Sequence, residues 1–372
     1  SCSLVRIGTV TRWSSLIGIE DILKEDIIMK RSWKAALLAS AAVGALVLGG
    51  CGSDQGASGD KPQIGVAIYK FDDTFMSGVR AEIDKAAKDK AKVDIVDSQN
   101  SQPTQNEKID LFINKKYKAI GVNVVDRTAA GVIIDKAKAA NIPLVFLNRE
   151  PLKEDMAKWD KVYYVGAKAE QSGEMQGKIL ADYFKKHPEA YHSNDGVIHY
   201  VMITGEPGHQ DAVLRTQYSV ESLKKEGMKV EELASDTGMW DRVKGQEKMA
   251  AFLSRYGDKI DAVICNNDDM ALGAIEALKA AGYFTNGKYI PVVGVDATTP
   301  AVQALKDGTL LGTVLNNAKK QGQAVFNLSY VLAKGETPNK DNVGFDIVDG
   351  KYIWVPYEIV TKENADKILG DK

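Results

Sequence analysis

A strand, a polar turn and an amphipathic helix follow one another in residues 63–88, QIGVAIYKFDDTFMSGVRAEIDKAAK. The run Ile64–Tyr69 is short, apolar and bounded by polar residues, which predicts a buried strand. In Phe75–Lys88 the apolar residues recur at helical spacing, for example at Val79 and Ile83. A strand followed by a helix is the unit from which parallel α/β sheets are built.

The same alternation repeats along most of the chain. Further strands are expected at Val93–Val96, Ala119–Val124, Pro143–Leu147, Val197–Ile203, Ala262–Cys265, Val292–Val295 and Leu311–Leu315. Further helices are expected at Gln102–Lys115, Ala129–Ala140, Gln171–Lys185, Asp211–Glu226, Val243–Arg255 and Ala271–Ala281. This pattern predicts parallel sheets covered by helices on both faces, and the length fits two domains.

The composition is that of a soluble globular protein. The 372 residues include 48 basic and 50 acidic side chains, and 44% of the residues are hydrophobic. These values exclude a disordered chain, a collagen-like chain and a polytopic membrane protein. The balanced charge, without a long Lys/Arg block, argues against nucleic-acid binding. Three scattered cysteines are too few for a disulfide framework or a metal cage, and Cys265 is expected to be a buried, inert thiol.

Residues 29–50 have the composition of a secretory signal peptide. Met29 is followed by a basic stretch and then by apolar or small residues from 35 to 50, a run too short for a transmembrane span of ~20 residues. Cys51 directly follows two glycines, which resembles the lipobox of bacterial lipoproteins. This resemblance implies that Cys51 is lipidated and becomes the mature N-terminus; an ordinary secretory signal is the alternative.

Two segments flank this signal. A basic region that starts at Met29 would not be recognised as N-terminal behind residues 1–28. Lys24-Glu25-Asp26 can be encoded by AAG-GAG-GAT, a strong ribosome-binding sequence. We therefore expect residues 1–28 to be translated upstream DNA, with a genuine N-terminal extension as the alternative. Residues 51–61 are rich in Gly, Ser and Asp and are expected to form a flexible tether.

Polar and aromatic side chains follow nearly every predicted strand in both halves of the chain. Ligands of open α/β sheets bind outside the carboxyl ends of the strands, so these side chains are candidates for a binding site. The candidates are Tyr69, Asp73, Phe75, Asn123, His209, Asp211, Arg215, Trp240, Asn267, Asp296 and Asn316. Each one alone has an ordinary explanation as a helix cap, a turn former or a packing residue, so the prediction depends on their repetition.

The chemistry of this set points to a small polyhydroxylated ligand. Carboxylates accept hydrogen bonds from hydroxyl groups, arginine donates them, and side-chain amides do both. The apolar C–H faces of a sugar ring suit flat aromatic surfaces such as Phe75 and Trp240. A phosphate fits poorly, because the set has one arginine, Arg215, and no glycine-rich cradle.

Several segments resemble the bacterial galactose/glucose-binding proteins of ABC sugar importers, which are periplasmic binding proteins of the galactose/ribose type. The segments are Ile64–Met76, Gly205–Asp211, Met239–Asp241, Asn266–Asp268, Gly294–Ala297 and Gly312–Asn316. The similarity runs from about Gln63 to about Glu358. It implies two Rossmann-like α/β lobes with parallel sheets, joined by a three-segment hinge. The expected N-terminal lobe is 62–141 and 318–352, and the expected C-terminal lobe is 142–317 and 353–372.

The resemblance also implies a function and a location. The protein is expected to capture D-galactose or D-glucose outside the cytoplasmic membrane and to deliver it to an ABC permease by hinge closure. Ten candidate residues match the family's hydrogen-bonding and stacking positions, and Tyr69 matches the tyrosine at the cleft edge. Asp73 matches the residue that contacts the 4-hydroxyl of either epimer. We expect a monomer that is anchored through Cys51, with no catalytic residue and no nucleic-acid partner.

One feature of the family looks lost. The resemblance implies an EF-hand-like calcium loop at Tyr191–His199 with a distant acidic residue at Asp261. Only Asp195 and the backbone oxygen of Val197 remain as secure ligands, whereas Ca²⁺ takes six or more oxygens. We therefore expect no structural calcium and no cofactor. Three histidines in this region could suggest zinc, but their irregular spacing favours surface histidines.

The sequence favours this interpretation over an enzyme and over a DNA-binding regulator. A glycosidase needs two opposed carboxylates, but Asp73, Asp211 and Asp296 each match a binding role. A sugar repressor needs a helix-turn-helix, and none precedes Gln63. A receptor that feeds a membrane sensor or chemoreceptor remains an open alternative.

Overall fold

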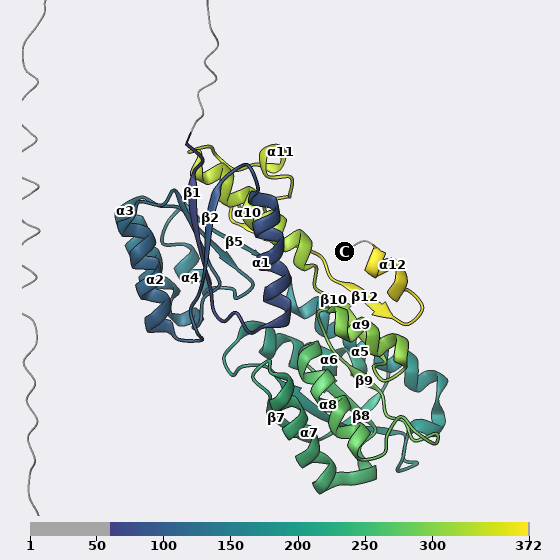
Figure 1. Ribbon diagram of the computed structural model, residues 1–372. Coiled ribbons are helices and arrows are strands. Elements are labelled where there is room, and N and C mark those ends of the chain that lie inside the picture. Colours follow the sequence, from purple (N-terminus) through teal and green to yellow (C-terminus); the bar gives the residue numbers. More distant parts are fainter. Residues whose placement is uncertain (1–59, 371–372) are drawn as a thin grey trace, which may run out of the picture. The chain divides into compact units, whose positions relative to one another are not determined.

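The computed structural model describes residues 60–370, which belong to a single compact unit, Gly59–Lys372. Figure 1 shows two α/β lobes, each built around one sheet. The expected signal peptide, Cys51 and the tether up to residue 59 lie outside the described residues. Within residues 60–370, no helix is long and apolar enough to cross a membrane.

The first lobe contains a six-stranded sheet with the order β11-β5-β4-β3-β1-β2, in which all neighbours are parallel. Its strands are β1 (Gln63–Ile68), β2 (Lys92–Asp97), β3 (Ala119–Val122), β4 (Leu144–Leu147), β5 (Val162–Gly166) and β11 (Tyr352–Trp354). Its helices are α1 (Thr74–Ala87), α2 (Gln102–Asn114), α3 (Ala130–Ala140), α4 (Lys153–Met156), α10 (Ala318–Ala333) and α11 (Lys340–Val343). Helices α1 and α10 cover one face of the sheet, and α2 and α3 cover the other.

The second lobe repeats this plan with the strand order β12-β10-β9-β8-β6-β7. Its strands are β6 (Val197–Thr204), β7 (Lys229–Thr237), β8 (Ala262–Cys265), β9 (Val292–Val293), β10 (Gly312–Leu315) and β12 (Glu358–Thr361). Its helices are α5 (Ala169–Lys186), α6 (Gln210–Lys225), α7 (Arg242–Tyr256), α8 (Asp268–Ala280), α9 (Thr299–Asp307) and α12 (Ala365–Gly370). Only β12 runs antiparallel to its neighbour in this sheet. Short 3₁₀ turns occur at Arg127–Ala129, Pro188–Ala190 and Gly257–Lys259.

The predicted fold class is confirmed, and each expected strand and helix is present with its ends shifted by at most three residues. The strands β5, β7, β11 and β12 were not expected, and neither were the helices α9 and α10 or the short helices α4, α11 and α12. Strand β7 shows one reason. Its side chains are mostly exposed, because it lies at the edge of the sheet and pairs only with β6. An edge strand lacks the apolar run that marks a buried one, so its sequence gives a weak signal.

The predicted boundary of the N-terminal lobe at residue 141 is wrong. Strand β4 pairs with β3, and β5 pairs with β4, so the first sheet continues to Gly166. Both strands are buried along their whole length, as expected for interior parallel strands. The chain then passes to the second lobe before α5, returns between β10 and α10, and passes again between β11 and β12.

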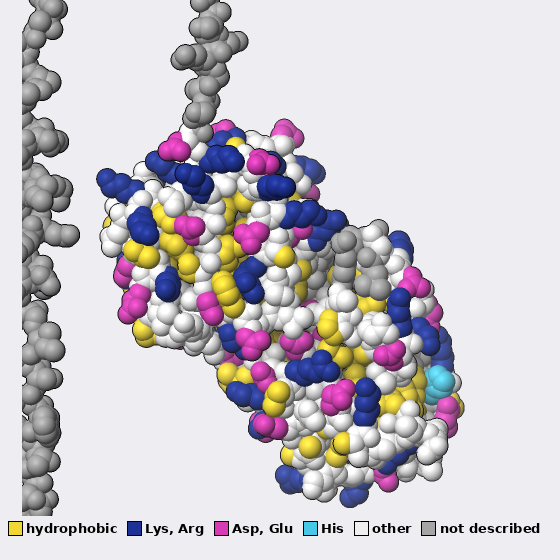
Figure 2. Space-filling model, in the orientation of Figure 1, with side chains coloured by type: hydrophobic (Ala, Val, Ile, Leu, Met, Phe, Trp, Pro, Cys, Tyr) yellow, Lys and Arg dark blue, Asp and Glu magenta, His cyan; other side chains and the backbone are white. Residues whose placement is uncertain are grey.

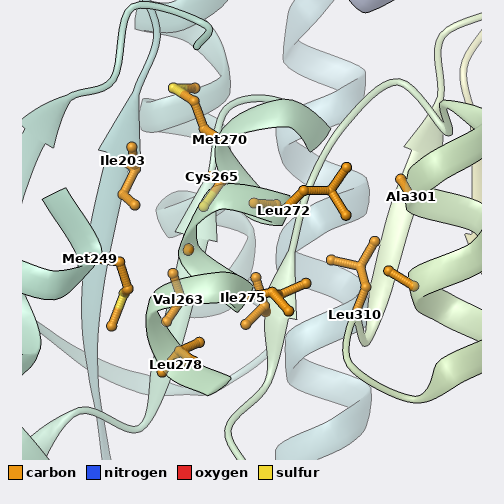
Figure 3. Close-up of a cluster of buried hydrophobic side chains, with 14 of the residues drawn as sticks. Ile203, Met249, Val263, Cys265, Met270, Leu272, Ile275, Leu278, Ala301 and Leu310 are labelled. Atoms are coloured by element: carbon orange, nitrogen blue, oxygen red, sulfur yellow. The ribbon is translucent and has the colours of Figure 1, made fainter. Parts of the chain in front are cut away.

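The core of each lobe is formed where helices pack on the sheet. Figure 3 shows part of the second lobe, where Cys265 at the end of β8 lies among Met270, Ile203 and other apolar side chains. Cys265 is fully buried and free, and burial raises the pKa of its thiol, as expected for an inert cysteine. Figure 2 shows acidic and basic side chains interspersed over the visible surface, in keeping with the balanced charge.

Candidate functional site

A small polar cavity lies between the two lobes, where the carboxyl ends of both sheets meet. The lining residues are Tyr69, Asp73, Phe75, Met76, Asn148 and Arg149 from the first lobe, His209, Asp211, Arg215, Trp240, Asn267 and Asp296 from the second, and Asn316 from the crossing between β10 and α10.

Helix N-termini fix several of these side chains. Asp73 caps α1, because its Oδ1 accepts from the backbone N–H of Met76 at 2.8 Å. Its Oδ2 accepts from the Tyr69 hydroxyl at 2.5 Å. Asn267 caps α8 by accepting from the Met270 N–H at 3.0 Å. A capping residue lies at the carboxyl end of a parallel strand, so the same geometry that starts each helix brings a polar group to the cavity.

His209 caps α6 and is neutral. Its Nδ1 accepts from the backbone N–H of Asp211 at 3.0 Å, which leaves Nε2 as a hydrogen-bond donor. Burial holds the pKa of the imidazole well below its usual range, and the nearby guanidinium groups of Arg149 and Arg215 act in the same direction. The site therefore presents a neutral histidine that can donate to a ligand oxygen.

The Arg215 guanidinium is held by several partners from the second lobe. Its Nε donates to Ser172 Oγ at 3.1 Å, and its Nη1 donates to the Asn266 carbonyl at 3.0 Å. Its Nη2 donates to the Tyr357 hydroxyl at 2.9 Å and lies 3.5 Å from Asp211 Oδ2. A guanidinium that is fixed in this way needs little reordering when a ligand binds.

The pKa values of two of the three cavity carboxylates are raised by burial. Burial raises the pKa of Asp211 to about 6, although the positive charges of Arg215 and Arg149 oppose this rise. Burial likewise raises the pKa of Asp296 well above its usual value, again against Arg215. Because hydroxyl donors favour the ionised form, a polyhydroxylated ligand would stabilise both carboxylates as anions.

Asp296 is held by hydrogen bonds from the segment between β10 and α10, where the chain returns to the first lobe. Asn316 Nδ2 donates to Asp296 Oδ1 at 3.2 Å, and Gln321 Nε2 donates to Asn316 Oδ1 at 2.5 Å. Asp296 and Ala297 both have positive φ, at 127° and 55°. Such backbone geometry is costly for residues other than glycine and is common at binding sites.

Two aromatic side chains supply the apolar surface of the cavity. Phe75 and Trp240 are 8% and 9% exposed. The Trp240 ring packs against the edge of His209 and over Gly205, where a Cβ would lie 2.1 Å from the indole. The indole N–H is buried, and it has no hydrogen-bond partner in the part of the chain that the structure describes.

Ten of the eleven residues predicted from the sequence line the cavity, and Asn123 does not. Asn123 is fully buried. Its Oδ1 accepts from the Tyr69 N–H at 3.1 Å, and its Nδ2 donates to the Leu147 carbonyl at 3.2 Å. The side chain of Asn123 therefore joins the ends of β1 and β4 behind the cavity wall.

Three lining residues were not predicted: Met76, Asn148 and Arg149. Asn148 and Arg149 directly follow β4, so their place at the end of a predicted strand is the sequence signal that marks them. Met76 lies in the first turn of α1, where a buried methionine has no signal that separates it from core residues.

The region of the expected degraded calcium loop is held by hydrogen bonds to one carboxylate. Asp261 is fully buried. Its Oδ1 accepts from the His192 N–H at 2.8 Å, and its Oδ2 accepts from the His199 N–H at 2.8 Å and lies 3.0 Å from His199 Nδ1. Among residues 60–370, no group of three or more His, Cys, Asp or Glu side chains could hold a metal ion.

Several known proteins are similar to this chain over most of its length. The family described as "Periplasmic binding protein domain" matches residues 64–337. The D-galactose/methyl-galactoside binding periplasmic protein MglB of Haemophilus influenzae is 42% identical over 90% of this chain and 99% of its own length. A putative rhizopine-binding protein of Rhizobium meliloti is 33% identical over 82% of this chain and 92% of its own length. An ABC transporter solute-binding protein of Bacillus halodurans, solved with myo-inositol, is 29% identical with a TM-score of 0.72, over 85% of this chain and all of its own.

Proposed function

Since this chain belongs to the periplasmic binding protein family, we propose that it captures D-galactose or D-glucose outside the cytoplasmic membrane and delivers the sugar to an ABC permease. The coarser part of this statement follows directly from the family: the chain is a sugar-binding protein, and its relatives are binding proteins rather than enzymes. The resemblance noted from the sequence is thereby confirmed.

The observation that carries the choice of a hexose is the composition of the cavity. Three carboxylates, three side-chain amides, a neutral histidine and two guanidinium groups surround a space that is also lined by Phe75 and Trp240. Carboxylates and amides can each accept from hydroxyl groups, and the aromatic rings suit the C–H face of a pyranose. The likeness to a galactose-binding relative over nearly the full chain favours galactose and its epimer glucose.

A hexose is large enough to supply the binding free energy that this mechanism needs. A micromolar Kd corresponds to about −8 kcal/mol. Divided over the roughly twelve heavy atoms of a hexose, this is about −0.7 kcal/mol per atom, within the ceiling for small ligands. The ligand gains this free energy only when both lobes contact it, so binding favours the closed form over the open one.

The lobes already touch across the cleft in this structure. Thr74 Oγ1 on the first lobe donates to Asp269 Oδ2 on the second at 2.7 Å. Arg127 Nη1 donates to Gln210 Oε1 at 2.5 Å. We assign these contacts to the closed arrangement, which is the form expected to hold the sugar.

The proposal is tested by calorimetry on Gly59–Lys372 after bound sugar has been removed. D-Galactose, D-glucose, D-ribose, D-xylose and myo-inositol are titrated separately. We expect saturable one-to-one binding of galactose or glucose that is lost in Asp296→Ala. Asp307→Ala is the matched control, because this exposed carboxylate in α9 lies on the same lobe. Wild-type protein that binds neither hexose would overturn the proposal.

Anchoring and transport need their own experiments. We propose that Cys51 carries the lipid anchor; this residue lies outside the described part of the chain. In cells, Cys51→Ser is expected to release the protein from the membrane fraction. Deletion of the gene is expected to reduce uptake of labelled galactose. If the deletion strain took up galactose normally but no longer responded to it by chemotaxis or signalling, the protein would instead be a receptor that feeds a membrane sensor.

A further inference from the structure

We propose that the ion pair between Arg149 and Glu206 is a clasp that stabilises the closed form, so that Arg149 is a positioning residue as well as part of the cavity wall. Arg149 follows β4 on the first lobe, and Glu206 follows β6 on the second. The proposal deepens the proposed function, on which it rests, because it names a pair that couples closure of the lobes to sugar binding.

The first lobe fixes the Arg149 side chain. Asn148 has a positive φ of 63°, and the Arg149 N–H donates to the Leu147 carbonyl at 2.7 Å, which makes a tight turn at the strand end. The guanidinium lies 3.8 Å from the centroid of the Tyr69 ring, and its Nη1 donates to the Val125 carbonyl at 2.7 Å. The side chain is only 5% exposed, so its position is well determined by its surroundings.

The partner carboxylate comes from the opposite lobe. Glu206 Oε2 lies 2.6 Å from Arg149 Nη1, and the Glu206 side chain is 23% exposed. Glu206 is not among the residues that line the sugar cavity, as the structure describes it. The pair can therefore change sugar affinity through closure, without contact between Glu206 and the sugar.

Opening of the lobes would break this pair. The Arg149 guanidinium would keep its place on the Tyr69 ring and its hydrogen bond to the Val125 carbonyl, but it would exchange its counter-ion for water. In the closed form the same charge also acts on the second lobe, because it opposes the rise in the pKa of Asp211 that burial causes. Arg149 thus favours the closed form and the ionised state of a carboxylate in the cavity.

The prediction for affinity follows from the population of the closed form. The apparent Kd of a protein that binds only when closed is inversely proportional to the fraction of closed molecules. Removal of the Glu206 charge is expected to lower the ratio of closed to open molecules about tenfold, which corresponds to about 1.4 kcal/mol. Where the open form predominates without sugar, the Kd should rise by the same factor, mainly through faster dissociation; where the closed form predominates, the rise is smaller.

The test uses Glu206→Gln and two readouts on Gly59–Lys372. The first is the Kd and the dissociation rate for the sugar that the wild type binds. The second is single-molecule energy transfer between dyes on Lys115→Cys and Glu247→Cys, two exposed positions on different lobes, with and without sugar. Cys265 is fully buried and stays unlabelled. Both the affinity and the closed fraction should fall in Glu206→Gln.

Two further variants test whether the effect of Glu206→Gln comes from the pair with Arg149. Glu226→Gln removes an ion pair of the same length, 2.6 Å to Lys185, but within one lobe, and should change neither readout. In the background of Arg149→Gln, addition of Glu206→Gln should cause no further loss, because the clasp is already broken.

Unchanged affinity and unchanged closure in Glu206→Gln would overturn the clasp. An undiminished effect of Glu206→Gln in the Arg149→Gln background would also overturn it. If the wild type bound no sugar, the proposed function would fail, and the energy transfer without sugar would still decide the clasp.

Discussion

Arg215 donates a hydrogen bond to the Tyr357 hydroxyl at 2.9 Å, across 142 residues of sequence. Arg215 lines the sugar cavity from α6, whereas Tyr357 is a buried residue just before β12 and is not part of the cavity lining that the structure describes. The third crossing of the chain between lobes ends beside this bond. The end of the chain therefore helps to orient a guanidinium of the site that it does not itself line.

Tyr357→Phe should weaken sugar binding about tenfold while the fold is kept. Without the hydroxyl, Arg215 Nη2 is left with Asp211 Oδ2 at 3.5 Å, and a hydrogen bond to a charged group contributes about 1.5–3 kcal/mol. Calorimetry measures the affinity and thermal unfolding measures the fold. Tyr330→Phe is the control, because no described group bonds its hydroxyl; an equal loss there would contradict the explanation.

Sugar affinity should fall as the pH decreases below about 6. Burial raises the pKa of Asp211 to about 6, and a hydroxyl donor prefers the ionised carboxylate. The Kd at pH 5 should therefore be about tenfold higher than at pH 7. The raised pKa of Asp296 acts in the same direction. Titrations in two buffers of different ionisation enthalpy should show proton release on binding near pH 6; a Kd that is independent of pH would exclude this mechanism.

The same titration has the opposite effect on the stability of the sugar-free protein. The pKa of Asp211 is raised from 3.8 to about 6 in the folded state. Its contribution to stability is thus fully present below pH 4 and lost as the pH rises through 6. A shift of two units corresponds to about 3 kcal/mol. Asp211→Asn should therefore be more stable than the wild type at pH 7.5, and about equally stable at pH 4, although it binds sugar poorly.

Gly205→Ala should disrupt the aromatic wall of the cavity. A Cβ at this position would lie 2.1 Å from the Trp240 ring, so the indole would have to move. We expect at least a tenfold loss of affinity, which corresponds to about 1.4 kcal/mol. Gly227→Ala is the control: its φ of 85° imposes strain, but no described atom lies within 4 Å. It should cost about 1 kcal/mol of stability without a change in Kd.

The sequence was sufficient for the α/β alternation, for most of the buried strands with the helices that follow them, and for most of the cavity-lining residues. Buried parallel strands are continuous apolar runs, and the residues after them cap helices, so both signals are local. The lobe boundary was misplaced because it depends on which sheet β4 and β5 join. That choice is made by pairing between strands, for which a single apolar run carries no information.

The prediction of Asn123 and the omission of Arg149 also depend on contacts between segments that are distant in sequence. Asn123 and Arg149 both follow strands of the first sheet, and position along the chain cannot say which one reaches the cavity. The structure shows that Asn123 is used for hydrogen bonds to Tyr69 and Leu147. The Arg149 side chain instead extends across the cleft to Glu206. The direction of each side chain depends on neighbours that are distant in sequence.

Chelators should leave the melting temperature unchanged. The buried Asp261 carboxylate accepts from two backbone N–H groups, those of His192 and His199, which satisfy its charge without a cation. Asp261→Ala, in contrast, should cost about 2 kcal/mol, because two partly buried backbone donors lose their partner. Thermal unfolding with and without EDTA is the measurement. A drop of several degrees that calcium chloride reverses would show that a structural calcium ion is present.

The roles of Asn123 and Asn267 should separate when stability and affinity are measured together. Asn123→Ala leaves the Tyr69 N–H and the Leu147 carbonyl without their buried partner, so we expect a loss of about 2 kcal/mol of stability. Its effect on affinity should be small and indirect. Asn267→Ser keeps a side-chain oxygen that can cap α8 but removes the amide from the cavity, so affinity should fall about tenfold with little change in stability.

The opposite result for Asn123 would be informative. If Asn123→Ala unfolded at the wild-type temperature but bound no sugar, the amide would have to contact the ligand directly. Asn123 would then have to exchange its bonds to the ends of β1 and β4 for bonds to sugar hydroxyls. Such an exchange would release the turn that carries Arg149, so sugar binding would act on the clasp as well as on the cavity.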